Sequence, residues 1–123
     1  MLWIVCGMIG AQEGLSMILQ INFNLNVPAS EYEDMARSVA QTFADVPGLV
    51  WKIWLLNEAT LEAGGIYQFE NQASLDAFLN GPLVAQVKAM TAIRDLSVKQ
   101  FRVMTDVTSV TRGPVEAFSK AHA

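Results

Sequence analysis

The sequence predicts a single α+β domain in which helices cover one face of a four-stranded antiparallel sheet. Three observations favour this class: four stretches with strand composition, helical periodicity between them, and the order strand, helix, strand, strand, helix, strand. That order is typical of the ferredoxin-like split βαβ arrangement. Because two helices cover only one face of such a sheet, the other face must meet water or a second subunit.

The first strand and helix are the clearest elements. Residues 17–27 alternate between an apolar face and a face of amide side chains: Leu19, Ile21, Phe23 and Leu25 against Gln20, Asn22, Asn24 and Asn26. A helix is expected from Ser30, because Ser30 and Glu33 have the spacing of a capping box and apolar residues recur at helical spacing as far as Phe43. Val46-Pro47-Gly48 ends this helix, since proline cannot continue it and glycine permits a turn.

A hairpin is predicted in the middle of the chain. Residues 49–56 are rich in β-branched and aromatic side chains and predict a second strand, and residues 63–69 predict a third strand paired with it. The second strand is mainly apolar on both of its faces. It is therefore expected to be covered on both sides.

The second half of the chain predicts another helix and the last strand. Asn71 or Ser74 is expected to cap a helix that runs through Asn80 and stops at Gly81-Pro82. A further helical segment is expected at residues 83–90, and residues 96–107 return to strand character. The remaining tail has weak periodicity and is expected to run over the surface or onto a partner subunit.

Residues 1–16 are expected to be an extraneous extension, with the domain at residues 17–123. The run MLWIVCGMIGA is too short to span a bilayer as a helix, and it lacks the basic region and the cleavage site of a signal peptide. Gln12-Glu13-Gly14 can be encoded by codons that spell a purine-rich ribosome-binding sequence shortly before Met17. This favours Met17 as the start of translation.

Composition excludes several classes of partner and cofactor. The chain has 123 residues, a net charge of −4 and eight scattered basic residues, so nucleic acid is not expected as a partner. Cys6 is the single cysteine, and His122 is the single histidine. Neither an internal disulfide nor a Cys/His metal site is therefore expected, and His122 is expected to have no role in function. A content of 52% hydrophobic against 16% charged residues predicts a homodimer, because such a chain has apolar surface to cover. A cytoplasmic location away from the membrane is expected.

A family resemblance rests on residues 47–79, PGLVWKIWLLNEATLEAGGIYQFENQASLDAFL. This stretch resembles the signature segment of the YdhR-type monooxygenase family, which is related to the antibiotic-biosynthesis monooxygenases. Its most specific pieces are Pro47-Gly48, Trp51-Lys52 with Trp54, and residues 62–67 with Phe69. The resemblance extends from about Met17 to Thr108 and implies a dimeric α+β barrel that oxygenates small aromatic compounds.

The resemblance implies a chemistry that needs little from the protein. In related cofactor-independent oxygenases, an electron-rich phenol or enol reacts with dioxygen in an apolar pocket that excludes water. No cofactor is expected, because the sequence has no GxGxxG motif or P-loop, and one histidine cannot form a 2-His-1-carboxylate iron site. The predicted function is a cofactor-independent monooxygenase for a small aromatic or polyketide-like compound and dioxygen. The alternatives are an isomerase or cyclase on the same scaffold, or a non-catalytic dimer that binds a small molecule.

The two tryptophans of the second strand must face opposite sides of the sheet, because they are three residues apart. Trp54 is expected in a cavity on the face without helices, together with Lys52, because a lysine is costly to bury under helices unless it is paired. Trp51 is then expected in the core. A role for both tryptophans in packing alone fits the pattern equally well.

Six residues are candidates for the site. Those for catalysis are Asn22, Trp54 and Tyr67, and those for substrate binding are Asn24, Lys52 and Arg102. The asparagine amides could bind a substrate oxygen or simply face solvent, and Tyr67 could donate a hydrogen bond into the pocket or only pack. Lys52 could stabilise a substrate anion or pair with Glu58 or Glu62, while Arg102 could bind an anion or form a surface ion pair. Glu62 is a possible base if it is buried.

Overall fold

The computed structural model describes residues 16–115, which form a four-stranded antiparallel sheet in the order β2-β3-β1-β4. Its strands are β1 (Met17–Leu25), β2 (Leu49–Asn57), β3 (Glu62–Phe69) and β4 (Ile93–Arg102). The central strand β1 pairs with β3 and β4, and β2 pairs with β3 as the predicted hairpin. The predicted α+β class is confirmed. The expectations for residues 1–15, Cys6 and His122 lie outside the described residues.

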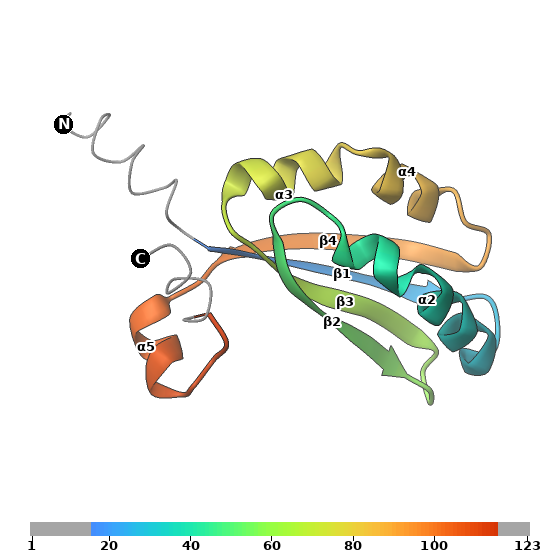
Figure 1. Cartoon of the computed structure of the whole chain (residues 1–123). Coiled ribbons are helices and arrows are strands. Elements are labelled where there is room, and N and C mark those ends of the chain that lie inside the picture. The colour runs from blue at the N-terminus through green and yellow to red at the C-terminus, as the bar shows by residue number, and fades with distance from the viewer. Residues whose placement is uncertain (1–15, 116–123) are drawn as a thin grey trace.

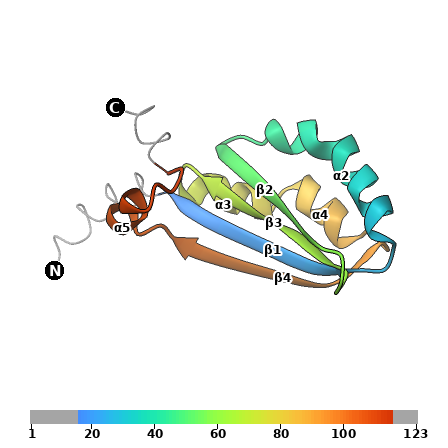
Figure 2. The same ribbon diagram turned by 90° about the horizontal axis from the view of Figure 1, so that it is seen from below.

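Three helices lie over one face of the sheet, as Figures 1 and 2 show. They are α2 (Ala29–Ala44), α3 (Gln72–Leu79) and α4 (Pro82–Lys88). The covered face, here the helix face, includes the buried residues of β1: Leu19, Ile21, Phe23 and Leu25. The opposite face, here the open face, carries the alternate residues of the same strand, including Asn22 and Asn24. The alternation of β1 is thus confirmed.

The start of α2 differs from the prediction. The helix begins at Ala29, its N-cap is Pro28, and no side chain caps it, so the predicted capping box at Ser30 and Glu33 is wrong. Pro28 already has the extended backbone of an N-cap residue, and its carbonyl oxygen accepts hydrogen bonds from the N–H groups of Glu31 and Tyr32. Ser30 therefore lies within the first turn, where its side chain cannot serve as the N-cap.

The turns at Asn71 and Pro82 follow the sequence signals. The side chain of Asn71 accepts a hydrogen bond of 2.9 Å from the backbone N–H of Ser74 and caps α3, as predicted. Pro82 follows the end of α3 and is the first residue of α4. At this position the missing backbone N–H of proline costs nothing, because the first N–H groups of a helix have no partner within the helix. The short helix α4 ends at Lys88, two residues before the predicted limit at Met90.

The last strand lies earlier than expected. β4 covers Ile93–Arg102 rather than 96–107, and residues 105–110 form the short helix α5 (Thr105–Val110) beyond one end of the sheet (Figure 1). The register between β1 and β4 shifts between Asn22 and Asn24, and Asp95 takes a φ of 58° at this irregularity. The polar Arg94-Asp95 pair hid the start of the strand from pattern analysis. Among residues 16–115, no helix is long and apolar enough to cross a membrane.

Candidate functional site

The register of the hairpin decides which way the side chains of β2 point. Lys52 lies opposite Tyr67, and Trp54 lies opposite Gly65. Tyr67 and Gly65 in turn lie opposite Leu19 and Ile21 of the helix face. Lys52 and Trp54 therefore face the helices, so the prediction that they share the open face with Asn22 and Asn24 is wrong.

Trp51 occupies the open face, and its predicted place in the helix-covered core is also wrong. It lies opposite Gln68, and its indole Nε1 donates a hydrogen bond of 3.3 Å to the carbonyl oxygen of Pro114. The segment after α5 thus returns to the start of β2. The strand alternation that separates the two tryptophans is confirmed, while their assignment to the two faces is reversed.

An apolar cavity of about 80 Å³ lies between the helix face and the helices. Its walls come from β1, β2, β3, β4 and all three covering helices, and are mostly aliphatic and aromatic. Three polar side chains reach it: Tyr32 from α2, Lys52 from β2 and Tyr67 from β3. A mainly apolar pocket with a few convergent polar groups is the usual form of a small-molecule site.

The amine of Lys52 lies among aromatic rings within this cavity. Its Nζ is 3.3 Å from the ring centroid of Trp54, 3.6 Å from that of Phe43 and 4.7 Å from that of Tyr67. The faces of such rings attract a cation when the amine is protonated. Phe43 packs edge-on against Trp54 with ring centroids 5.3 Å apart, so the rings also hold one another in place.

Gly65 makes room for this lysine. A Cβ added at Gly65 would come within 2.8 Å of Lys52 Cε and 3.4 Å of Tyr67 Cε1. Because Gly65 lies beside Lys52 on the helix face, its missing side chain leaves the space that the stem of the lysine crosses. Gly65, the second of the paired glycines in the signature segment, thus lets Lys52 take its position in the site.

Burial of Lys52 without a counter-charge sets its protonation. Among residues 16–115 it makes no ion pair and no hydrogen bond, so the predicted alternative of a pair with Glu58 or Glu62 is not realised. Desolvation lowers the pKa of Lys52 to about 7, because the charged amine is disfavoured away from water. A large fraction of Lys52 is therefore neutral near pH 7.

The two phenols of the cavity are shifted in the opposite sense. Burial raises the pKa of Tyr67, with a further contribution from nearby Tyr32, and burial also raises the pKa of Tyr32. Both hydroxyls stay protonated across neutral pH, and neither makes a hydrogen bond within the described part of the chain. They are potential donors to a bound molecule.

The predicted site residues Asn22 and Asn24 lie on the other side of the sheet. Asn22 accepts a hydrogen bond of 2.9 Å from Gln20 Nε2 and donates one of 3.4 Å to Glu62 Oε2. Asn24 donates one of 3.0 Å to Asp95 Oδ2. Their amides are used within the chain, and the sheet separates them from Lys52, Trp54 and Tyr67.

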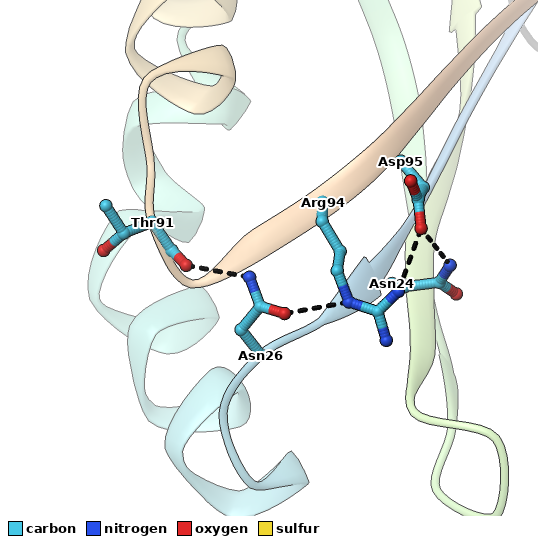
Figure 3. A network of polar contacts seen from close by, with 5 residues as sticks. All are labelled: Asn24, Asn26, Thr91, Arg94 and Asp95. Atoms are coloured by element: carbon cyan, nitrogen blue, oxygen red, sulfur yellow. Dashed lines mark hydrogen bonds and ion pairs between the residues drawn. The ribbon is translucent and has the colours of Figure 1, made fainter.

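Figure 3 shows how the Asn24 interaction continues into a network where β1 meets β4. Arg94 contacts Asp95 Oδ2 at 2.9 Å and donates a hydrogen bond of 2.9 Å to Asn26 Oδ1. Asn26 donates one of 3.0 Å to the carbonyl oxygen of Thr91. These contacts surround the positive φ of Asp95 and fix the irregular start of β4.

Two other polar residues lie away from the cavity. Arg102 is exposed at the end of β4, opposite Met17, and makes no ion pair within residues 16–115. Gln68 is fully buried on the open face, and its amide has no partner among the described residues. Of the six predicted site residues, the structure thus brings together Lys52, Trp54 and Tyr67.

Sequence reasoning missed the contribution of α2 to the cavity. Tyr32 and Phe43 belong to the apolar stripe that predicts a helix packed on a core, and this periodicity does not distinguish a core from a cavity wall. The tyrosine within the stripe was the available signal, since a buried phenol usually has a polar partner. No group of His, Cys, Asp and Glu residues that could hold a metal ion is present in residues 16–115.

The sequence model of one family, described as "Putative mono-oxygenase ydhR", matches residues 18–114. The chain belongs to this family. The residues matched include the hairpin and all three residues that the cavity brings together. Among curated proteins, a sequence search finds no match.

Solved structures with the same fold come from several bacteria. SnoaB, a cofactor-independent oxygenase from Streptomyces nogalater, shares 17% identity over 76% of this chain and 97% of its own, with a TM-score of 0.62. NE2512 from Nitrosomonas europaea shares 15% sequence identity over 76% of this chain and 93% of its own, with a TM-score of 0.64. A dimeric ferredoxin-like protein from Thermobifida fusca shares 14% sequence identity over 73% of this chain and 92% of its own, with a TM-score of 0.59. At these identities the similarity shows the fold alone.

Proposed function

We propose that this protein is a cofactor-independent monooxygenase that acts on a small aromatic or polyketide-like compound in the cavity under α2. The observation that carries the proposal is an apolar cavity with one unpaired amine and two protonated phenols. Family membership and the fold shared with the oxygenase SnoaB support the same reaction class.

In this proposal Lys52 supplies the base. A phenolic or enolic substrate binds in the cavity beside the rings of Phe43 and Trp54, where its acidic O–H can reach the neutral amine. Transfer of the proton leaves an ammonium beside the substrate anion, which the cavity stabilises by charge. A pKa of about 7 suits this task, because the amine can accept and return a proton near neutral pH.

The substrate anion then supplies the electrons that reduce dioxygen. In the overall reaction the CH₂ of the substrate's keto tautomer, which in the phenol or enol form is a C–H with the second hydrogen on the hydroxyl oxygen, becomes C=O: the carbon gains one oxygen atom, and the two hydrogens leave with the other oxygen as water. No external reductant is needed. Tyr67 remains protonated and can donate a hydrogen bond to the reduced oxygen, while the apolar walls keep out water.

A homodimer through the open face is part of the proposal. Ile53 and Phe101 lie on this face with 49% and 47% of their surface exposed, although both are large and apolar. A second copy of the chain would cover them. Sedimentation of the wild type as a monomer, or no change on Ile53→Asp, would remove this part of the proposal.

Oxygen consumption with a panel of phenols and naphthols tests the function. Trp54→Phe should lower the uptake of dioxygen, while Trp51→Phe, the matched change on the open face, should leave it within about twofold. Asn22→Ala tests the sequence-based role of Asn22: loss of uptake in that variant alone would place the reaction on the open face.

The same assay separates the rival functions. Turnover that is independent of dioxygen would support an isomerase or cyclase. Binding of the phenols without any product under air would support a non-catalytic binding protein. An ultraviolet-visible spectrum of the purified protein checks the cofactor, because a flavin or haem band would contradict the proposal.

A further inference from the structure

Lys52 has the surroundings of a nucleophilic lysine as well as those of a base. Its Nζ lies within 3.6 Å of the ring centroids of Phe43 and Trp54, inside a cavity whose remaining walls are almost wholly apolar. The other titratable groups that line the cavity, among the described residues, are the phenols of Tyr32 and Tyr67. None of the described residues that line the cavity is an Asp or Glu.

Such an amine is chemically distinct from a surface lysine. Exposed lysines are protonated at neutral pH and have no free electron pair for attack on carbon. A lysine desolvated in an apolar pocket is the form in which enzymes use this side chain to make imines with carbonyl compounds. Gly65 allows the stem of Lys52 to reach the cavity, so the amine is presented to the space where a ligand would lie.

We propose that Lys52 is a covalent capture site for small, neutral, hydrophobic aldehydes and ketones, with which it forms an imine inside the cavity. The nitrogen electron pair forms a bond to the carbonyl carbon while the C=O π electrons move to oxygen. A proton moves from nitrogen to oxygen to give a carbinolamine. Loss of that oxygen as water, with the second amine proton, leaves the C=N bond.

Tyr67 is placed to assist this step. Its ring centroid is 4.7 Å from Lys52 Nζ, and its hydroxyl is protonated and without a partner among residues 16–115. A phenol in this position can donate a hydrogen bond to the carbonyl oxygen as charge develops there. The apolar walls favour the imine, because little water is present to reverse the reaction.

The lining of the cavity restricts the class of carbonyl compound. Lys52 is the one basic residue among the described residues of the wall, and imine formation uses its nitrogen. A keto acid would bring a carboxylate with no remaining cation to pair with, which is costly in an apolar site. Neutral carbonyl compounds with an aryl or short alkyl group are therefore the expected ligands.

Reductive trapping tests the proposal without dioxygen. The full-length protein is treated at pH 7, under nitrogen, with benzaldehyde and cyanoborohydride, and the benzylated lysines are then mapped by peptide mass spectrometry. Lys52 should be labelled roughly tenfold faster than the exposed Lys88 and Lys99 in the same chain. Under the same conditions in urea this preference should disappear, because it depends on the folded cavity.

Two variants sharpen the test. Lys52→Met should remove the fast label while Lys88 and Lys99 still react slowly. Gly65→Ala retains the lysine but places a methyl group against its Cε, so the preference for Lys52 should fall. Labelling of Lys52 at the same rate as Lys88 and Lys99 in the folded wild type would overturn the proposal, whatever the variants do.

The outcome is separable from that of the oxygenase proposal. Fast trapping at Lys52 in a protein that consumes no dioxygen would support imine formation and remove the oxygenase. Oxygen consumption in a protein whose Lys52 is not trapped would do the reverse.

Discussion

Both faces of the sheet carry polar side chains, but these differ in their hydrogen bonding: those of Asn22 and Asn24 on the open face have partners within the chain, and those of Lys52 and Tyr67 on the helix face do not within residues 16–115. On the open face, Asn22 and Asn24 are hydrogen-bonded to Glu62 and Asp95, and Gln68 is the buried exception. On the helix face, Lys52 and Tyr67 have no polar partner within residues 16–115. The hydrogen-bonding capacity of the helix face is therefore available to a ligand, whereas that of Asn22 and Asn24 is already used.

This difference has an energetic consequence. A buried polar group without a partner costs about 1–3 kcal/mol, and an unpaired charge costs more. The cavity thus keeps an unfavourable arrangement that a bound ligand can relieve by accepting a hydrogen bond or a proton. Substitutions on the helix face should mainly change function, and those on the open face should mainly change stability.

The largest effect is expected at the adjacent glycines Gly64 and Gly65, because an added Cβ would meet different obstacles at the two positions. At Gly64 an added Cβ would overlap the backbone carbonyl oxygen of Ile21 and lie 2.9 Å from Asn22 Cα. Gly64→Ala should therefore force β1 and β3 apart and lower the free energy of unfolding by about 3 kcal/mol or more. Urea denaturation followed by circular dichroism measures this loss.

Gly65→Ala is the matched control for that prediction. Its nearest obstacle is Lys52 Cε at 2.8 Å, near the end of a flexible side chain that can move aside. The cost should be about 1 kcal/mol. Equal losses for the two variants would contradict the claim that backbone contact at Gly64 and side-chain contact at Gly65 differ.

The next effect concerns Lys52 and pH. The folded-state pKa of about 7 lies below that of an unfolded lysine, so between these values the unfolded state binds more protons. Stability from this group is lowest below pH 7, where the amine is charged in both states, and it rises with pH above 7. Relative to Lys52→Met, the wild type should gain about 2 kcal/mol between pH 6 and pH 9.

Denaturation of both proteins across this range checks the prediction. Lys99→Met, at an exposed position of β4, is the matched control for removal of a lysine outside the cavity. The range ends at pH 9 because the raised pKa values of Tyr32 and Tyr67 lower stability at higher pH, where the unfolded phenols ionise first. A difference between wild type and Lys52→Met that is constant with pH would show that Lys52 is charged in the cavity.

The sequence predicted the fold well because its local signals agreed with one another. The alternation of β1, the cap at Asn71 and the hairpin partner of β2 all follow from residue pattern. The facing of β2 did not, since its apolar residues lie on both sides and periodicity cannot choose between them. The cost of burying a lysine favours the open face for Lys52, but the protein accepts that cost and surrounds the amine with aromatic rings.

The third prediction tests whether the free hydroxyl of Tyr67 serves ligands. Tyr67→Phe should leave the free energy of unfolding unchanged or raise it slightly, because the hydroxyl has no partner to lose within the described chain. Binding of a naphthol should weaken roughly tenfold, the cost of one lost hydrogen bond in an apolar site. Calorimetric titration measures the binding. Unchanged affinity together with lower stability would assign Tyr67 to packing alone.

The smallest effect is expected for Asn24. Its substitution should lower stability and leave ligand binding unchanged, which is the opposite of what is expected for Tyr67. Asn24→Ala removes the 3.0 Å hydrogen bond to Asp95 Oδ2 and loosens the network in Figure 3 where β4 begins. The loss of stability should be about 1 kcal/mol, because Arg94 still contacts Asp95 at 2.9 Å and keeps its charge paired. Naphthol affinity should not change, since the sheet separates this network from the cavity. A variant with normal stability and weakened binding would show instead that the open face takes part in the site.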